Sequence, residues 1–392
     1  MNRLVPAVIL RARGAARMRG LHPWVFRDDI ENDGGAANGD TVQAVDRAGR
    51  ICGHAFYSTR SKIALRRISA GEAEPDAAHW WAKLDRAAAL RRRVVGPHDT
   101  AFRAIHAESD GFPGLVVDRY AEHLVVQRQT AAAERLLAEL ASELLERSGA
   151  ASILARDDSA ARALEGLEAR VEQVRGRTPE SIEVREGETR YTVDPWRGQK
   201  TGAFLDQRSN RVRLGALCRG RVLDAFCYQG GFALHAARRA DEVLAIDSSE
   251  SALARGREAA ESNGLSSRIR FVQSKVFDEL KRLGQRGERF DVVFVDPPAF
   301  ARSRADVRAA TRAYGEVNRR ALGLVAPDGL LVTCSCSYNF GEELFERMLA
   351  AAAVDAGREA RVLERLTQSP DHPILLGFPE SHYLKCFVLD VL

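Results

Sequence analysis

The stretch Val222-Leu-Asp-Ala-Phe-Cys-Tyr-Gln-Gly-Gly-Phe232 decides the fold of the C-terminal half of this chain. It has the pattern of a hydrophobic strand that ends near an acidic residue, followed by a glycine pair that opens a helix. Glycines at such a turn let the backbone approach a ligand closely, because they carry no Cβ atom. The pattern is not G-x-G-x-x-G and it lacks phosphate-cradling residues, which disfavours a dinucleotide ligand.

Strands and helices alternate around this stretch, from about Tyr191 onward. Strands are expected at 221–226, 242–247, 269–273, 290–296 and 329–335, and helices start at Gly231, Ser249 and Glu342, with one more through 314–324. This alternation predicts an α/β fold, a doubly wound parallel sheet with helices on both faces. Such sheets bind their ligands beyond the carboxyl ends of the strands, so functional residues are expected there.

An acidic residue ends the second of these strands, in Leu244-Ala-Ile-Asp247. An acid about twenty residues after the glycine turn commonly accepts hydrogen bonds from both ribose hydroxyls. Either feature alone is compatible with a purely structural βα turn. Together they predict a cofactor that contains a nucleoside.

The stretch Asp291-Val-Val-Phe-Val-Asp-Pro-Pro-Ala-Phe300 is more specific. A buried apolar strand carries Asp296 to its carboxyl end, and two prolines fix the following backbone as an extended turn. Such an acid can hydrogen-bond the polar edge of a planar base while the aromatic ring packs against that base. The alternative is a strand that simply ends at a proline.

Two cysteines end the strand in Leu330-Leu-Val-Thr-Cys-Ser-Cys-Ser-Tyr338. Cys334 and Cys336 face the same side if the strand stays regular. The other cysteines show no zinc spacing, so no metal is expected. Free cysteines are usually buried and inert, but a strand end in the same sheet as Asp296 favours a reactive thiol.

The length and composition suit two or three ordinary globular domains. The predicted boundaries are 1–73 for a small β-rich domain, 76–190 for a central α+β module and 191–392 for the doubly wound domain. No apolar run reaches the ~18 residues of a membrane helix. Six cysteines in 392 residues match no disulfide framework, which predicts reduced thiols, a cytoplasmic location and no membrane partner.

The net charge of +4 belongs entirely to residues 1–75, which hold twelve basic and eight acidic side chains. Arginine presents a planar fork that suits phosphates and bases. One basic face is therefore expected on the first domain, unless these are ordinary solvated side chains: Arg11, Arg13, Arg17, Arg19, Arg60, Lys62, Arg66 and Arg67.

The C-terminal half resembles class I S-adenosylmethionine-dependent methyltransferases. The whole chain is similar to bacterial large-subunit ribosomal RNA cytosine-carbon-5 methyltransferases that carry an N-terminal PUA domain, a small RNA-binding β-barrel. The resemblance rests on the stretches above together with His22-Pro-Trp-Val-Phe26, Ala107–Arg119, Gly198-Gln-Lys-Thr-Gly-Ala-Phe-Leu-Asp-Gln-Arg208, Ser335-Cys-Ser337, Asp371-His-Pro373 and Pro379–Lys385.

The resemblance implies an RNA methyltransferase with S-adenosylmethionine as its cofactor, 23S ribosomal RNA or a large-subunit particle as its partner, and a possible homodimer. It assigns Cys336 as the nucleophile and Asp296 to the target base. Cofactor contacts are implied for Lys200, Thr201, Gly202, Phe204, Asp206, Gln207, Asp224, Phe226, Tyr228, Gly230, Gly231, Asp247, Ser248 and Asp296. Substrate contacts are implied for Pro297, Pro298 and Phe300, and for Arg11, Arg13, Arg60 and Lys62.

Two positions depart from the pattern of these relatives. They usually carry an acid two residues before Phe277, where it bonds the adenine amino group, and this chain has Lys275. Adenine recognition would then fall to backbone groups or to Asp278. Gln229 stands where threonine is usual, and its amide can still bond the cofactor carboxylate.

Two other functions fit the same residues. An exocyclic-amine methyltransferase that acts on guanine or adenine would need the Asp-Pro-Pro-aromatic stretch but not Cys336. A non-catalytic RNA-binding assembly factor would keep the fold without turnover, and Lys275 in the adenine site keeps this alternative open.

Overall fold

The computed structural model describes residues 5–301 and 303–392. They form two compact units, each built from separate segments of the chain. The first unit comprises the residues up to Val184 together with Val193–Leu205 and Pro370–Ser381; the second comprises Arg185–Thr192, Asp206–Ser369 and His382–Leu392. The predicted domain boundaries cut the chain differently and remain predictions.

The N-terminal part of the first unit is a six-stranded sheet of strand order β2-β6-β5-β4-β1-β3. Its elements are β1 Ala7–Leu10, α1 Ala12–Arg19, β2 Trp24–Phe26, β3 Ile30–Asn32, β4 Thr41–Val45, β5 Ile51–Tyr57 and β6 Ile63–Ser69. The sequence predicted a β-rich domain here, but strands of three or four residues such as β1, β2 and β3 carry too little periodicity to be located from sequence. Ala15 and Met18 anchor α1 on the core of this sheet.

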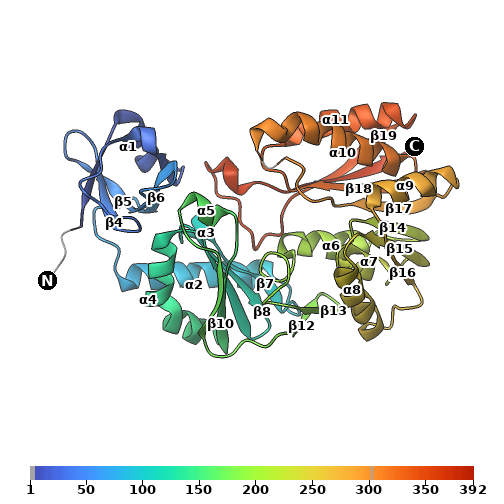
Figure 1. Cartoon of the computed structure of the whole chain (residues 1–392), viewed down its shortest axis with the longest axis horizontal. Coiled ribbons are helices and arrows are strands. Elements are labelled where there is room, and N and C mark those ends of the chain that lie inside the picture. The colour runs from blue at the N-terminus through green and yellow to red at the C-terminus, as the bar shows by residue number, and fades with distance from the viewer. Residues whose placement is uncertain (1–4, 302) are drawn as a thin grey trace. The chain divides into compact units, whose positions relative to one another are not determined.

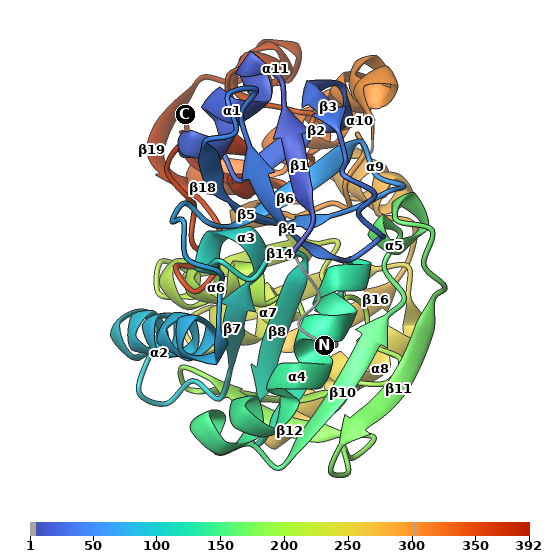
Figure 2. The same cartoon turned by 90° about the vertical axis from the view of Figure 1, so that its left-hand side faces the viewer.

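The central module of the first unit is a five-stranded sheet of order β11-β10-β9-β8-β7 (Figure 2). It contains α2 Ala77–Val94, β7 Ala101–His106, α3 Ala107–Asp110, β8 Leu115–Tyr120, β9 His123–Arg128, α4 Ala131–Ser148, β10 Ser152–Asp157, α5 Ala161–Leu164 and β11 Arg170–Arg175. Thr130 caps the start of α4 by accepting the Ala133 N–H at 3.1 Å, and Gly149 ends α4 with a φ of 64°. The two long helices share one hydrophobic core with the sheet.

The second unit is built on a seven-stranded sheet of order β16-β15-β14-β17-β18-β20-β19. Its elements are α6 Arg208–Gly215, β14 Arg221–Ala225, α7 Gly231–Ala236, β15 Glu242–Asp247, α8 Glu250–Ser262, β16 Ile269–Gln273, α9 Val276–Gln285, β17 Phe290–Val295, α10 Val307–Leu322, β18 Val325–Ser335, α11 Glu342–Asp355, β19 Ala360–Leu366 and β20 Lys385–Val391. A hairpin of β12 Ile182–Glu186 and β13 Thr189–Val193 precedes it. Neighbouring strands from β16 to β18 are parallel, and β20 is antiparallel to both β18 and β19.

Helices cover both faces of this sheet (Figure 1). Leu223 and Ala225 of β14 point into the core formed with α9, α10 and α11. Val222 of the same strand points into the opposite core, with α6, α7 and α8. Such two-sided burial explains the continuous apolar strands, and it confirms the predicted doubly wound α/β fold. Within the described ranges, no helix is long and apolar enough to span a bilayer.

Candidate active site

The strand order reverses at β14, which pairs with β15 on one side and β17 on the other. The loop that leaves β14 holds three residues in the left-handed region, with φ values of 66° at Phe226, 52° at Tyr228 and 74° at Gly230. A Cβ atom on Gly230 would lie 2.8 Å from the ring of Phe271, so only glycine fits there. Strain of this kind concentrates at functional sites.

Asp247, at the end of β15, is held by this loop. Its two carboxylate oxygens accept the backbone N–H groups of Tyr228 and Ser249, each at 2.9 Å. The side chain is half-buried, so the fixed carboxylate keeps lone pairs for a ligand. This arrangement fits a ribose diol.

Asp224, near the end of β14, is 1% exposed. One carboxylate oxygen accepts the Ala233 N–H at 2.9 Å, and the other is buried with no hydrogen-bond partner among the described residues. Burial, together with the nearby charges of Asp296 and Asp247, raises the pKa of Asp224 to about 7. Three carboxylates at one sheet edge with an unsatisfied buried oxygen fit a cationic ligand.

Asp296 follows β17 and is oriented by an amide chain. Gln207 donates from Nε2 to Asp296 Oδ2 at 3.0 Å, and its Oε1 accepts Asn210 Nδ2 at 2.7 Å. Asn210 also donates to the Thr367 carbonyl at 3.1 Å. Gln207, which is predicted to contact the cofactor, therefore also bonds this acid. Its neighbour Asp206 accepts the Tyr383 hydroxyl at 3.0 Å.

Cys336 lies just beyond the end of β18, the parallel neighbour of β17. The flanking serines hold its loop: the hydroxyl of Tyr314 on α10 hydrogen-bonds both Ser335 Oγ and Ser337 Oγ at 3.0 Å. Ser337 Oγ also accepts the Ala301 N–H at 3.2 Å, which ties this loop to the Asp-Pro-Pro-Ala-Phe segment.

The exposure of Cys336 sets it apart. It is half-buried, whereas the other five cysteines of the chain are buried. Cys334 lies within β18 and faces Cys386 of β20 in the antiparallel register. The pKa of its thiol lies well above the usual range because of Cys386 and burial. The regular strand ends at Ser335, so the two cysteines have different surroundings.

Aromatic rings continue from the loop after β14 to α10. Phe226 and Phe277 meet edge-on with centroids 6.2 Å apart, and Phe300 packs on Tyr314 at 4.7 Å. Pro297 is buried and Pro298 exposed. Such rings give planar bases an apolar surface.

The remaining predicted cofactor residues of the second unit, Gly231 and Ser248, lie at the start of α7 and just after β15. A Cβ atom on Gly231 would lie 2.7 Å from Arg211 Cδ. Lys275, at the position where relatives carry an acid, is exposed just before α9, and Asp278 is exposed in the first turn of α9. Gln229 is half-buried.

Four predicted cofactor residues belong to the first unit instead. The buried Thr201 hydroxyl donates to Asp118 Oδ2 at 2.6 Å and contacts the Tyr120 hydroxyl at 2.8 Å. The Lys200 ammonium lies 4.6 Å from the ring centre of Phe204. Gly202 has a φ of 138°, and a Cβ there would lie 2.3 Å from Val193 Cγ1.

The basic side chains of residues 1–75 are largely paired within their own unit. Arg66 binds Glu108 at 2.9 Å and Glu165 at 3.1 Å, Arg67 donates to backbone carbonyls, and Arg13 pairs with Asp29. Arg11, Arg60 and Lys62 are exposed. The predicted single basic face is thus reduced by internal ion pairs.

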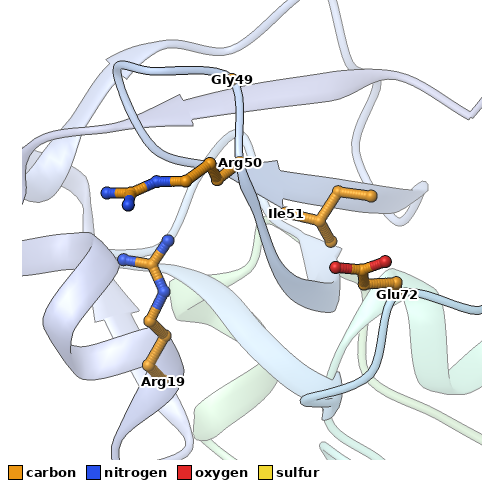
Figure 3. A pocket seen from close by; sticks show the side chains of 5 residues that line it. All are labelled: Arg19, Gly49, Arg50, Ile51 and Glu72. Carbon is orange, nitrogen blue, oxygen red and sulfur yellow. The ribbon is translucent and has the colours of Figure 1, made fainter.

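An open pocket of about 700 Å³ lies in the N-terminal part of the first unit. It is lined by Arg19, Gly49, Arg50, Ile51 and Glu72 (Figure 3). Both arginines bind Asp46, at 2.8 Å and 2.9 Å. The hydrogen bond from Arg19 holds the pKa of Asp46 well below its usual range. This pairing neutralises much of the positive charge of the pocket.

Two family models match the chain: an S-adenosylmethionine-dependent methyltransferase model over residues 155–379 and a PUA-like domain model over residues 8–70. A relative from Tolumonas auensis, named Ribosomal RNA large subunit methyltransferase I, is 40% identical over 94% of this chain and 95% of its own length. A relative of the same name from Vibrio cholerae is 36% identical over 99% of this chain and 100% of its own.

Solved structures share the fold. A Streptococcus mutans structure described as a SAM-dependent methyltransferase has a TM-score of 0.81 at 20% identity, over 98% of this chain and 100% of that one. A second, described as a methyltransferase complexed with SAH, has a TM-score of 0.83 at 20% identity and the same coverage. The chain therefore belongs to the S-adenosylmethionine-dependent methyltransferases, with a PUA-like domain at its N-terminal end.

Proposed function

We propose that this enzyme methylates carbon 5 of a cytosine in large-subunit ribosomal RNA through a covalent adduct on Cys336. The names of its relatives support the RNA substrate. The observation that carries the chemistry is the placement of Cys336. It is half-buried and lies beyond the strand next to the one that carries Asp296, between two serines that the Tyr314 hydroxyl holds.

Carbon 5 of cytosine is a poor nucleophile, and a thiolate corrects this. The Cys336 thiolate gives its electron pair to carbon 6, and the electrons of the carbon 5–carbon 6 double bond move to carbon 5. When bound, S-adenosylmethionine supplies an electrophilic sulfonium methyl group to that carbon. A base then removes the carbon-5 proton, the sulfur–carbon bond breaks, and the double bond and the thiolate are restored.

Asp296 has the geometry to hold the base during this addition. Gln207 fixes one of its oxygens, and a carboxylate accepts hydrogen bonds from the cytosine amino group and from protonated N3. Asp247 is proposed to hold the cofactor ribose, and Asp224 to bind a positively charged group of the cofactor. Pro297, Pro298 and Phe300 are proposed to contact the extruded base, which leaves its stack at a cost of a few kcal/mol.

The basic residues of the first unit are proposed to contact RNA phosphates, with Arg11, Arg60 and Lys62 as the exposed candidates. A cytoplasmic location and a homodimer remain predictions. The four residues of the Lys200–Phe204 segment likewise remain predicted cofactor contacts.

Product analysis tests the proposal. The enzyme is incubated with unmodified large-subunit RNA and methyl-labelled S-adenosylmethionine, and the RNA is digested to nucleosides. The label is expected in 5-methylcytidine, and the Cys336→Ala variant should give no label. The wild-type enzyme should form a trapped covalent complex with RNA that contains 5-fluorocytidine. Label in guanosine or adenosine, or full activity of Cys336→Ala, would refute the carbon-5 mechanism.

A further inference from the structure

Lys385 is a buried lysine beside the proposed nucleophile. It begins β20 and lies opposite Ser335 of β18 in the antiparallel register, one residue before Cys336. It is 4% exposed. Its ammonium group donates to the Ser337 carbonyl at 2.7 Å and to the Tyr383 carbonyl at 2.9 Å. The ammonium thus binds the carbonyl of the residue that immediately follows the cysteine.

In the part of the chain that the structure describes, no carboxylate forms an ion pair with this ammonium. Burying a charge without an opposite charge is costly, and burial lowers the pKa of Lys385 to about 8. Two ionisable groups act against that loss of charge, Cys336 on the adjoining loop and Glu342 on α11. The Tyr314 hydroxyl is a further titratable group at the loop, and it stays neutral because burial raises its pKa.

A second buried lysine shows what a structural role looks like. Lys83 on α2 is 7% exposed and likewise donates to two carbonyls, those of Ile68 and Gly111, each at 2.7 Å. Its pKa is lowered to about 7 by burial and by the cations Arg86 and Arg67. Two carbonyls therefore suffice to hold a buried lysine, but Lys385 differs because its neighbour is a half-exposed thiol.

We propose that Lys385 is a positioning residue for Cys336, which stabilises the thiolate by its charge and fixes the cysteine loop through the Ser337 carbonyl. This inference rests on the proposed function, because it assigns the lysine to the thiol that forms the adduct. Ionisation of Cys336 releases one proton to solvent, while Lys385 keeps its own proton. The sulfur electron pair then forms the bond to carbon 6, and elimination restores the thiolate beside the same ammonium.

The charge of Lys385 gives the proposal a pH signature. A cation next to a thiol lowers the thiol pKa. Replacing Lys385 with methionine keeps the aliphatic volume and removes the charge, so Cys336 should ionise only at higher pH. A shift of at least about one pKa unit lowers the thiolate fraction near neutral pH about tenfold.

Alkylation of the full-length enzyme with iodoacetamide measures this directly. The rate is followed from about pH 6 to pH 10 by mass spectrometry of the peptide that contains Cys336, for the wild type, Lys385→Met, Lys385→Arg and Lys83→Met. Lys385→Met is expected to shift the dependence of the alkylation rate to higher pH. Alkylation should be about tenfold slower near neutral pH and should return to the wild-type rate at alkaline pH. Lys385→Arg should stay near the wild-type profile, and Lys83→Met should not move it.

The methylation rate against pH is the second measurement, with thermal unfolding as the check that each variant folds. Lys385→Met should recover methylation at high pH, whereas a merely structural lysine would give a loss that pH does not restore. An unchanged alkylation profile in folded Lys385→Met would overturn this inference and leave the proposed function intact. If Cys336→Ala methylates RNA normally, the proposed function itself fails.

Discussion

Replacing Asp224 with asparagine removes the buried carboxylate and keeps its shape. The asparagine oxygen can still accept the Ala233 N–H, which is 2.9 Å from the carboxylate in the wild type. What is lost is the negative charge behind the oxygen that has no partner among the described residues. If that oxygen binds a positive group of S-adenosylmethionine, the affinity for the cofactor should depend on the ionisation of this single acid.

The magnitude follows from the raised pKa. Burial and two neighbouring carboxylates raise the pKa of Asp224 to about 7. At about pH 5.5 only about 3% of the enzyme would have an ionised Asp224. The Kd for S-adenosylmethionine should then be about 30-fold higher than at about pH 8.5, which is a loss of about 2 kcal/mol in binding free energy. Asp224→Asn should bind at least about tenfold more weakly at the higher pH, because a hydrogen bond to a charged group is worth about 1.5–3 kcal/mol.

Titration calorimetry with S-adenosylmethionine over this pH range is the assay. Asp241→Asn is the matched control, because Asp241 is an exposed acid just before β15. Near pH 6 the wild type should also release about one proton on binding, visible as a dependence of the heat on the buffer. A wild-type Kd that changes less than about threefold, or a variant that keeps the full pH dependence, would refute the reasoning.

Three further predictions follow from other residues. In the absence of cofactor the folded protein favours protonated Asp224, so this stabilisation is present below the ordinary pKa of 3.8 and is lost as the pH rises through about 7. Between about pH 5.5 and 8.5, the free energy of unfolding measured with urea should therefore fall by about 2 kcal/mol more for the wild type than for Asp224→Asn. An equal dependence of unfolding free energy on pH in the two proteins would contradict this. Gly230→Ala should cost about 1–3 kcal/mol in unfolding free energy and weaken cofactor binding, because its φ is 74° and its Cβ would meet Phe271; Gly284→Ala on α9, where a Cβ has open space, is the control that should show neither effect. Tyr314→Phe removes the hydroxyl that holds both serines and should lower the methylation rate about tenfold to a hundredfold with cofactor affinity unchanged; a normal rate would mean that the serines do not need this contact.

The doubly wound sheet was predictable because buried parallel strands are continuous apolar runs with turn residues between them. The placement of Asp296 and Cys336 was also predictable, since each follows such a strand and the carboxyl ends of neighbouring parallel strands lie at the same side of the sheet. β19 and β20 were missed. β19 is mostly exposed at the sheet edge, so its sequence carries no buried pattern.

Side-chain pairing is what the sequence pattern could not show. Gln207 stands in a stretch assigned to the cofactor by resemblance, and only the fold reveals that its amide bonds Asp296. In the same way, arginines 66 and 67 add to a positive charge count, whereas the structure commits them to Glu108, Glu165 and backbone carbonyls. A charge count cannot separate solvated cations from internal ones, because pairing depends on contacts between distant segments.

Lys385 shows why topology matters most at the catalytic edge. It lies 49 positions after Cys336 in the chain, and neither periodicity nor spacing links the two. The link arises because β20 runs antiparallel between β18 and β19. An antiparallel strand begins where the neighbouring strands have their carboxyl ends, so the first residue of β20 faces the loop that follows β18. The reversed strand therefore places a buried cation beside a thiol at the carboxyl ends of the parallel strands, where the other charged groups are carboxylates. The carboxylates oppose ionisation of the thiol, whereas the cation favours it.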